Sequence, residues 1–423
     1  MARICIITPG QLGSNPRVVK EANALAEAGH AVTVICTKVL ASVEPRDQAV
    51  MATARFKVHR IAFGHDPGWR IDRLMQIAAR HAFALWPIGA LAERAVSPMT
   101  RRLGQAALRE RADLYIAHYP AALPAAARVA ARHNARFAFD AEDFHTGQSR
   151  DDEGVSSETR VIATIERRYL PIANYVTAAS PGIADAVTRA YKIARPTVVL
   201  NTFPRDQAAQ CPVPIASFIS RPSVYWFSQT IGPDRGLEAA LEAIAQSGHA
   251  PHLYLRGTQS AGYADELIAH ATSLGIADRL HLLDPIEPDF LERAGAEYDI
   301  GYLGEPGETQ NSKVALANKL FSYFGSGLAI VASTTPAHCA IAPELGGAIK
   351  LFPPGDAVAL AARLDEWLDD RPALQAARIS AWTLGQTRFA WETDKATLVR
   401  RVSESLGSPS QPGANRMQRL SAS

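Results

Sequence analysis

Short apolar runs alternate with longer amphipathic segments along the whole chain. The runs are apolar on both faces, as expected of strands covered by helices on each side. Strands are predicted at residues 3–8, 31–36, 114–118, 136–140, 175–179 and 197–200, and again at 224–227, 253–256, 280–283, 300–303, 328–332 and 348–351. Helices are predicted among them at 16–28, 183–190, 237–247, 263–274 and 357–368. The alternation predicts an α/β fold with parallel sheets joined by crossover helices.

The predicted strands fall into two sets on either side of residues 204–222, a proline-rich segment with little periodicity. We therefore expect two Rossmann-like domains, an N-terminal one at residues 1–205 and a C-terminal one at 206–385. Residues 407–423 are polar and rich in serine, and we expect this tail to be disordered.

Composition supports a globular protein, because 47% of the 423 residues are hydrophobic and 20% are charged. No apolar stretch approaches the ~20 residues of a membrane-spanning helix. The four cysteines lack CxxC spacing, which favours buried thiols in a cytosolic protein. A formal net charge of +2 does not indicate a nucleic-acid-binding protein. We expect a cytoplasmic enzyme, with no nucleic-acid partner.

The charge is unevenly distributed. Residues 55–111 contain eleven basic and four acidic residues, a local charge of about +7. Within them, residues 69–111 form an insertion between the second and third predicted strands. Seven of its residues recur at helical spacing: Leu74, Ile77, Ala78, His81, Ala82, Leu85 and Trp86. Two interpretations remain open: an amphipathic helix that meets anionic lipid, or a helix packed on the sheet with a solvated basic face.

The first loop with chemical interest follows the first strand, at residues 8–17. Its glycines, Gly13 among them, allow close backbone approach to a ligand, and the helix that follows offers unpaired N–H groups to an anion. Asn15 and Arg17 would supply polar contacts. The spacing is not GxGxxG, which argues against a dinucleotide site. A tight strand-to-helix turn without a ligand is the alternative.

An acidic cluster ends the fourth predicted strand, at residues 139–146. Ligands of parallel α/β sheets bind beyond the carboxyl ends of the strands, so the cluster is well placed for function. Asp140, Glu142, Asp143 and His145 are suited to act as acid, base or acceptor of sugar hydroxyls. A set of helix caps and a metal site are the alternatives, although no further residues complete a coordination set.

Two loops of the C-terminal half suggest an anion site. Arg235 lies at the start of a predicted helix, where a cation is unfavourable unless an anion, such as a pyrophosphate, binds there. Asn318 and Lys319 open another predicted helix, which adds backbone donors and an ammonium. Together the loops predict a nucleotide-diphosphate site.

These motifs carry a family resemblance. The chain resembles the GT-B glycosyltransferases, and most of all family 4 of retaining enzymes, in the branch with an Asn-Lys-Leu-Phe-Glu-Tyr motif. The resemblance rests on residues 13–34, 140–145, 179–183, 232–236, 305–333 and 389–392. It covers nearly the whole chain except the basic insertion and the tail. It implies two Rossmann-like domains that face a central cleft, and a closing helix at 386–406 that crosses back to the first domain.

The resemblance also implies an activity: transfer of a sugar from a nucleotide-diphosphate sugar to an acceptor, with retention and with neither metal nor cofactor. Its implied catalytic residues are Glu142, Asp143, Arg235 and Lys319, with Glu142 at the place of a family histidine. The expected donor contacts are Gly13, Thr230, Gly232, Arg256, Glu305, Asn311, Asn318 and Ser322. The expected acceptor contacts are Asn15, Arg17 and His145.

Three positions besides Glu142 depart from the family pattern. The family's paired glutamates fall at Val314 and Ser322, and Thr230 stands at the place of a phosphate-binding basic residue. The leading hypothesis is a hexosyltransferase-like enzyme of polysaccharide or glycoconjugate biosynthesis, which extends a glycan or lipid-linked acceptor, with peripheral contact at the inner face of the plasma membrane. The alternatives are a catalytically silent scaffold with the same fold and a nucleotide-sugar epimerase.

Overall fold

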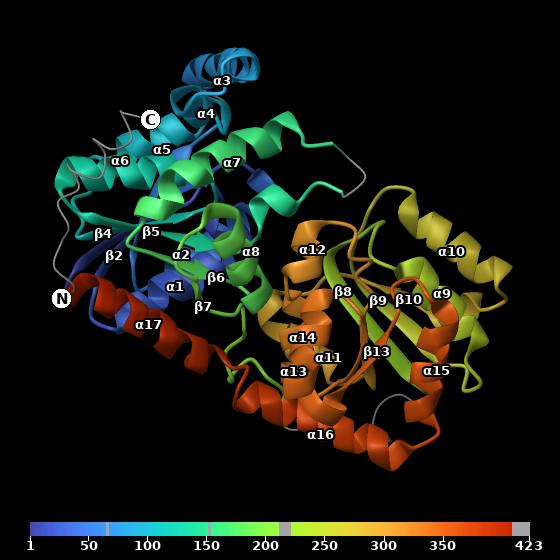
Figure 1. Ribbon diagram of the computed structural model, residues 1–423. Coiled ribbons are helices and arrows are strands. Elements are labelled where there is room, and N and C mark those ends of the chain that lie inside the picture. The colour runs from blue at the N-terminus through green and yellow to red at the C-terminus, as the bar shows by residue number, and fades with distance from the viewer. Residues whose placement is uncertain (65–66, 151–153, 211–220, 408–423) are drawn as a thin grey trace. The chain divides into compact units, whose positions relative to one another are not determined.

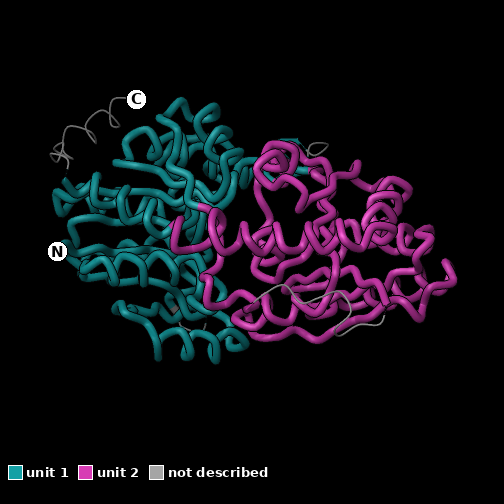
Figure 2. Tube along the Cα trace, turned by 90° about the horizontal axis from the view of Figure 1, so that it is seen from below, with its two compact units in different colours: residues 1–199, 309–311, 395–423 teal, residues 200–308, 312–394 magenta. Residues whose placement is uncertain are grey.

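The computed structural model describes residues 1–64, 67–150, 154–210 and 221–407. The chain divides into two compact units (Figure 2). Unit 1 comprises residues 1–199, 309–311 and 395–423, and unit 2 comprises residues 200–308 and 312–394. Unit 2 thus begins at residue 200, where the sequence suggested 206. The predicted tail from residue 408 and much of the proline-rich segment lie outside the described residues.

Unit 1 is built on a parallel sheet in the order β3-β2-β1-β4-β5-β6-β7 (Figure 1). Its strands are β1 (Arg3–Ile7), β2 (Ala31–Lys38), β3 (Lys57–Ala62), β4 (Leu114–His118), β5 (Arg136–Ala141), β6 (Tyr175–Ala178) and β7 (Thr197–Val198). The central strands are almost entirely buried. This confirms the predicted α/β fold for the first half of the chain.

Strand β3 is not among the strands predicted from the sequence. This strand pairs with β2 alone and is partly exposed along its length. An edge strand needs no apolar residues on both faces, so its sequence lacks the pattern that identified the others. The basic insertion therefore lies between the third and fourth strands, not between the second and third as predicted.

The helices of unit 1 are α1 (Pro16–Glu27), α2 (Glu44–Thr53), α3 (Pro67–Leu85), α4 (Gly89–Ala95), α5 (Thr100–Ala107), α6 (Leu123–His133), α7 (Ser157–Tyr169) and α8 (Pro181–Tyr191). The basic insertion forms α3, α4 and α5, with α3 packed on α4 and α7 (Figure 1). The expected closing helix corresponds to α17 (Trp391–Gly407), which groups with unit 1 from Lys395 onward.

Unit 2 contains a second parallel sheet, in the order β10-β9-β8-β11-β12-β13. Its strands are β8 (Ser223–Ile231), β9 (His252–Gln259), β10 (Leu280–Leu283), β11 (Ile300–Leu303), β12 (Ala329–Ser333) and β13 (Ile349–Phe352). Its helices are α9 (Leu237–Gln246), α10 (Tyr263–Ser273), α11 (Leu291–Gly295), α12 (Gln310–Val314), α13 (Asn318–Ser326), α14 (Pro336–Leu345), α15 (Ala357–Leu368) and α16 (Arg371–Gln386), with α12 beginning at the segment that groups with unit 1. Its core packs Trp226, Leu255, Ile300 and Val331 between α-helices on the sheet faces.

The strand order gives each sheet a switch point, where the chain reverses the direction in which it adds strands. In unit 1 the switch lies between β1 and β4, and in unit 2 between β8 and β11. The loops that leave the carboxyl ends of these neighbouring strands run in opposite directions and leave a crevice in which ligands of such sheets bind. The motifs at residues 8–17 and 232–236 follow β1 and β8, so both are at switch points.

Two further findings bear on the sequence predictions. Among the described residues, none of the helices combines the length and apolar character needed to cross a membrane. Cys5 and Cys36 are buried as expected, whereas Cys339 is exposed, and Cys211 lies outside the described residues.

Candidate functional sites at the two switch points

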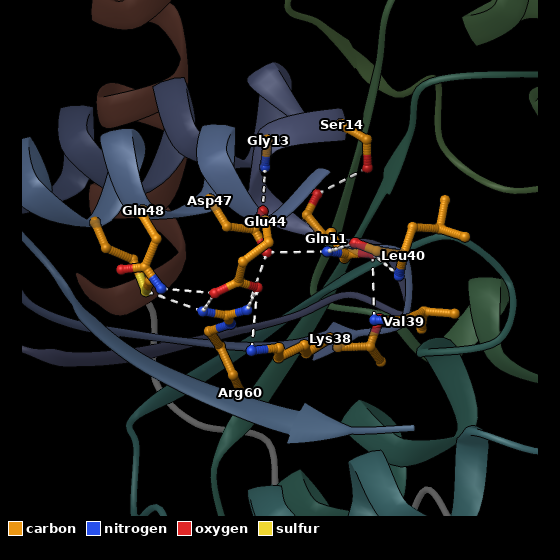
Figure 3. Close-up of polar contacts among 12 residues, drawn as sticks. Gln11, Gly13, Ser14, Lys38, Val39, Leu40, Glu44, Asp47, Gln48 and Arg60 are labelled. Atoms are coloured by element: carbon orange, nitrogen blue, oxygen red, sulfur yellow. Dashed lines mark hydrogen bonds and ion pairs between the residues drawn. The ribbon is translucent and has the colours of Figure 1, made fainter. Parts of the chain in front are cut away.

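The loop after β1 is held in place by two buried side chains, Gln11 and Asp47 (Figure 3). Asp47, on α2, accepts hydrogen bonds from the backbone N–H of Gly13 at 2.7 Å and from Gln11 Nε2 at 3.0 Å. The other end of the Gln11 amide accepts from the backbone N–H groups of Val39 and Leu40. Arg60 closes the network, pairing with Asp47 at 3.4 Å and with Glu44. The loop is therefore preformed.

Gly13 is required by packing. A Cβ atom at this position would lie 2.6 Å from Cβ of Arg46, so the loop approaches α2 closely here. Its N–H group is engaged by Asp47. The prediction that Gly13 contacts a donor remains a prediction.

A buried ion network joins α1 to the carboxyl ends of the central strands. The guanidinium of Arg17 makes two hydrogen bonds to Asp140, at 2.6 and 2.8 Å. His118, at the end of β4, lies 2.6 Å from Glu21 of α1 and 3.4 Å from Asp140. The hydroxyl of Thr177 donates to Asp140 at 2.5 Å. Buried charges are tolerated when they are paired and hydrogen-bonded in this way.

The network shifts the ionisation of its members. Burial acts to raise the pKa of Asp140, but Arg17 outweighs this effect and lowers the pKa to about 2. Burial acts to lower the pKa of His118, but the carboxylates of Asp140 and Glu21 raise it above its usual value. Asp140 is thus an ionised partner of Arg17. Within the acidic cluster, Asp140 therefore has a structural role, which is to hold α1 against the central strands.

The loop after β5 carries the other predicted residues. Glu142 and Asp143 are partly exposed, and burial raises the pKa of Glu142. His145 is buried, with Nδ1 3.4 Å from Glu166 of α7. Asn311, expected among the donor contacts, groups with unit 1, where it donates to Asp143 at 3.0 Å and accepts from the backbone of Phe144.

Asn15 and Tyr119 connect the two loops at the switch point of unit 1. The hydroxyl of Tyr119 donates to Asn15 Oδ1 at 3.0 Å, and Asn15 Nδ2 donates to Thr8 at 3.3 Å. Tyr119 has a φ of 66°, a left-handed conformation that a bulky residue rarely adopts. The sequence analysis missed Tyr119, and its position directly after a predicted strand was the available signal. The three expected acceptor residues, Asn15, Arg17 and His145, are all buried and form the floor of this region. Asn15 and Arg17 are hydrogen-bonded to other side chains, whereas His145 approaches Glu166 at 3.4 Å.

In unit 2 the loop after β8 packs against the loop after β11. Gly236, before α9, has a φ of 70°, and its carbonyl accepts from the hydroxyl of Tyr302 at 2.5 Å. A Cβ atom at Gly236 would lie 2.3 Å from the carbonyl oxygen of Gly304, so only glycine fits between the loops. Arg235 is exposed beside this glycine, while Gly232 is buried in the same loop.

Lys319 and Glu305 form an ion pair at the switch point of unit 2. Lys319, the second residue of α13, places Nζ 3.1 Å from Glu305 Oε1 and 5.5 Å from the ring centre of Trp226. Burial acts to raise the pKa of Glu305, but Lys319 and His338 lower it. The backbone carbonyl of Glu305 accepts from Ser333 of β12 at 2.7 Å. An ammonium beside a helix start, shielded from water, is a suitable site for a diphosphate.

The other expected donor residues have varied surroundings. Asn318 is exposed and accepts from Asn201 at 3.1 Å. Arg256 donates to the hydroxyl of Tyr225 at 3.1 Å, and Thr230 is exposed near the end of β8. Ser322 is only 1% exposed, and its hydroxyl donates to Glu292 of α11 at 2.6 Å.

The two parallel sheets and their switch-point loops give the chain the GT-B fold, that of a large class of glycosyltransferases. Residues 13–202 match the family described as glycosyl transferase 4-like domain, which confirms the resemblance found in the sequence. No curated protein gives a significant match to the chain.

Solved structures share the fold over nearly the whole chain. HepE from Anabaena, in complex with UDP, has a TM-score of 0.70 at 17% identity, covering 96% of this chain and 99% of that one. Sucrose-phosphate synthase from Thermosynechococcus elongatus has a TM-score of 0.69 at 16% identity, with the same coverage. WaaG, a glycosyltransferase involved in lipopolysaccharide biosynthesis, has a TM-score of 0.61 at 13% identity, covering 94% of this chain and 98% of that one. At these identities the likeness is one of fold.

Proposed function

We propose that the protein is a retaining, metal-independent glycosyltransferase that moves a sugar from a nucleotide-diphosphate sugar to a glycan or lipid-linked acceptor. The observation that supports this most strongly is the Lys319–Glu305 pair at the start of α13, beside the switch point of unit 2. The family match of residues 13–202 supports the same class of reaction. HepE structures in complex with UDP and with UDP-glucose make uridine diphosphate sugars the first donors to test.

In the proposed reaction, the bond between the anomeric carbon and the diphosphate breaks while the acceptor oxygen bonds to the same face of that carbon. The leaving diphosphate gains negative charge and takes the acceptor's proton. Lys319 and Arg235, together with the N-terminal N–H groups of α13, stabilise that charge in place of a metal ion. The diphosphate competes with Glu305 for the ammonium of Lys319.

We propose further that Thr230, Gly232, Arg256 and Asn318 line the donor site in unit 2. Ser322 is not included, because its hydroxyl is buried against Glu292. For the acceptor, Glu142 and Asp143 are the best candidates, since both residues are partly exposed at the carboxyl edge of the first sheet. The buried Asn15, Arg17 and His145 then position this edge from below.

The proposed setting is polysaccharide or glycoconjugate biosynthesis in the cytoplasm, at the inner face of the plasma membrane. The basic insertion supports it, because a lipid-linked acceptor would bring the enzyme to an anionic surface.

A sugar-transfer assay tests the proposal. The full chain is incubated with UDP-, GDP- and ADP-sugars, with and without glycan and lipid-linked acceptors, and nucleoside diphosphate release and the anomeric configuration of the product are followed. We expect release that depends on an acceptor and a product with the donor's configuration. Failure to bind any of these nucleotides would contradict both enzyme hypotheses and favour the silent scaffold.

The scaffold is the second candidate function, because Ser322 and Thr230 replace residues that hold the donor in the family and Ser322 is buried. A product sugar changed in configuration without any acceptor would instead identify an epimerase.

A further inference from the structure

Helix α3 departs from the usual amphipathic arrangement: beside the apolar Ala79 and Phe83 it buries two polar side chains, and it exposes several large apolar ones. A surface helix normally buries its apolar side and exposes its polar side. On α3 the residues that point inward include Asp72 and Gln76, each 4% exposed, whereas Leu74 is 65% exposed and Ile71 is 57% exposed.

Polar contacts on the side of α3 that faces the protein hold the helix in this orientation. Asp72 pairs with Arg101 at 2.7 Å and with Arg102 at 2.5 Å, both on α5. Gln76 Nε2 and Arg80 Nε donate to the backbone carbonyl of Ala95, at 3.2 and 3.0 Å. Rotating α3 to bury its apolar side would break these contacts and would move Asp72 from its buried position to the surface. The apolar side is thus held outward by the fold.

The outward residues form one continuous surface. Ile71, Leu74, Met75, Ala78, Ala82 and Leu85 recur every three or four positions, which places them along one stripe of a helix with 3.6 residues per turn. The stripe continues into the turn before α4, where Leu85, Trp86 and Ile88 are 71%, 63% and 57% exposed. We call this surface the α3 ridge. It includes several neighbouring large apolar side chains, unlike the scattered exposed residues of an ordinary surface.

The exposed charged residues of α3 and α4 themselves are all basic. Residues 67–95 contain only two acidic residues, Asp72 and Glu93, and both are buried in ion pairs. Arg70, Arg73 and Arg94 are exposed, and Arg80, 4.0 Å from Glu158 of α7, is half-exposed. An apolar stripe bordered by arginines, with a tryptophan at its end, has the features of a helix that lies in a membrane interface. If a second copy of the chain bound through the same surface, its arginines would face those of the first copy, and the like charges would repel one another.

We propose that the α3 ridge docks unit 1 onto an anionic lipid surface, with Leu74, Leu85 and Trp86 inserted among the headgroups and acyl chains and the neighbouring arginines on the anionic headgroups. The helix lies in the plane of the membrane and does not cross it. The α3 ridge and the switch-point loops share no residues, so the docking can be tested without any nucleotide.

Vesicle sedimentation of the full chain, without nucleotide or acceptor, tests the docking. The probes are phosphatidylcholine vesicles with and without phosphatidylglycerol. We expect the protein to pellet with the anionic vesicles and to be released at about 0.5 M salt, where the Debye length is only a few ångströms. Leu74→Gln combined with Trp86→Gln should lower the partition coefficient at least about tenfold, because two large side chains lose their burial. Arg70→Gln combined with Arg73→Gln should also lower it about tenfold or more at low salt.

The matched control is Ile268→Gln combined with Val358→Gln, which replaces similarly exposed apolar residues of unit 2 and should leave pelleting unchanged. The proposal is overturned if the wild-type protein pellets with neither vesicle, or if the Leu74 and Trp86 variant pellets like wild type. A third result would also overturn it: wild type forms a dimer in sedimentation velocity and does not bind vesicles, whereas the Leu74 and Trp86 variant is monomeric. The ridge would then be a contact between two copies of the chain. Since no nucleotide is present, none of these results depends on whether the protein transfers sugar.

Discussion

The ammonium of Lys319 lies 3.1 Å from the carboxylate of Glu305, and the pair sits where α13 begins and the loop after β11 turns. A cation in the first turn of a helix opposes the helix dipole, so this lysine is stabilised by a negative partner. In the structure the partner is Glu305, and in the proposed reaction the diphosphate joins or replaces it.

Replacing this lysine should impair the chemical step. We expect Lys319→Ala to raise the activation free energy by about 2–4 kcal/mol, because a developing charge loses one preorganised partner. The control is Lys350→Ala, which removes the lysine of an exposed pair with Glu366 in the same unit and should leave turnover unchanged. Steady-state kinetics of nucleoside diphosphate release measures both. Equal turnover in wild type and Lys319→Ala would mean that the diphosphate binds elsewhere.

The Arg17–Asp140 pair should make the free energy of unfolding fall as the solution becomes acidic. The pKa of Asp140 is lowered from 3.8 to about 2 in the folded protein. Its contribution, of order 2 kcal/mol, is therefore present above about pH 4 and is lost as the pH falls through about 2. Unfolding measured across this range should show the loss in wild type and a smaller loss in Asp140→Asn.

The control for this experiment is Asp185→Asn. Asp185 pairs with Arg195 at 2.6 Å, but both side chains are about half exposed, so the pair should contribute less than about 1 kcal/mol. An acid profile for Asp140→Asn that matches wild type would contradict the role given to the buried pair.

Even a methyl side chain at Gly13 should lower the stability of the folded protein. Gly13→Ala places a Cβ atom 2.6 Å from Arg46, so the loop or α2 must move, and we expect a cost of about 1–3 kcal/mol in the free energy of unfolding. Gly248→Ala is the control, because its added Cβ atom would make only an ordinary contact with Asp365, at 3.9 Å. Chemical denaturation measures both variants, and equal stabilities would show that the loop is not held against α2.

Ser322→Ala separates a structural role from a donor contact. Because the hydroxyl of Ser322 is buried and donates to Glu292, its loss should lower the free energy of unfolding by about 1–3 kcal/mol. UDP affinity, measured by calorimetry, should stay the same. A weaker affinity with unchanged stability would restore Ser322 to the donor site.

The sequence predicted most of the fold because most of its strands are buried on both faces and read as apolar runs. It missed β3, whose exposed edge position removes that signal. It also located the loops at the switch points, since Arg235 and Gly236 lie between a predicted strand and a predicted helix, and Lys319 lies at the start of another helix. Both results depend on local patterns.

The contact partners of the site residues could not be predicted from the sequence. Arg17 reads as a free cation near a helix start, but its guanidinium is bound by Asp140, which is 123 residues away in the chain. Ser322 reads as a donor contact, yet its hydroxyl donates to Glu292 of another helix. Such contacts depend on how distant elements pack, and no spacing in the sequence records them.

The central claim is that unit 2 binds a nucleoside diphosphate at Lys319, and titration of UDP, GDP and ADP into the full chain by calorimetry tests it most directly. We predict saturable binding of at least one of the three to wild type and to Lys350→Ala, with weaker binding to Lys319→Ala. Heat of dilution alone for all three nucleotides in the wild-type protein would contradict the claim.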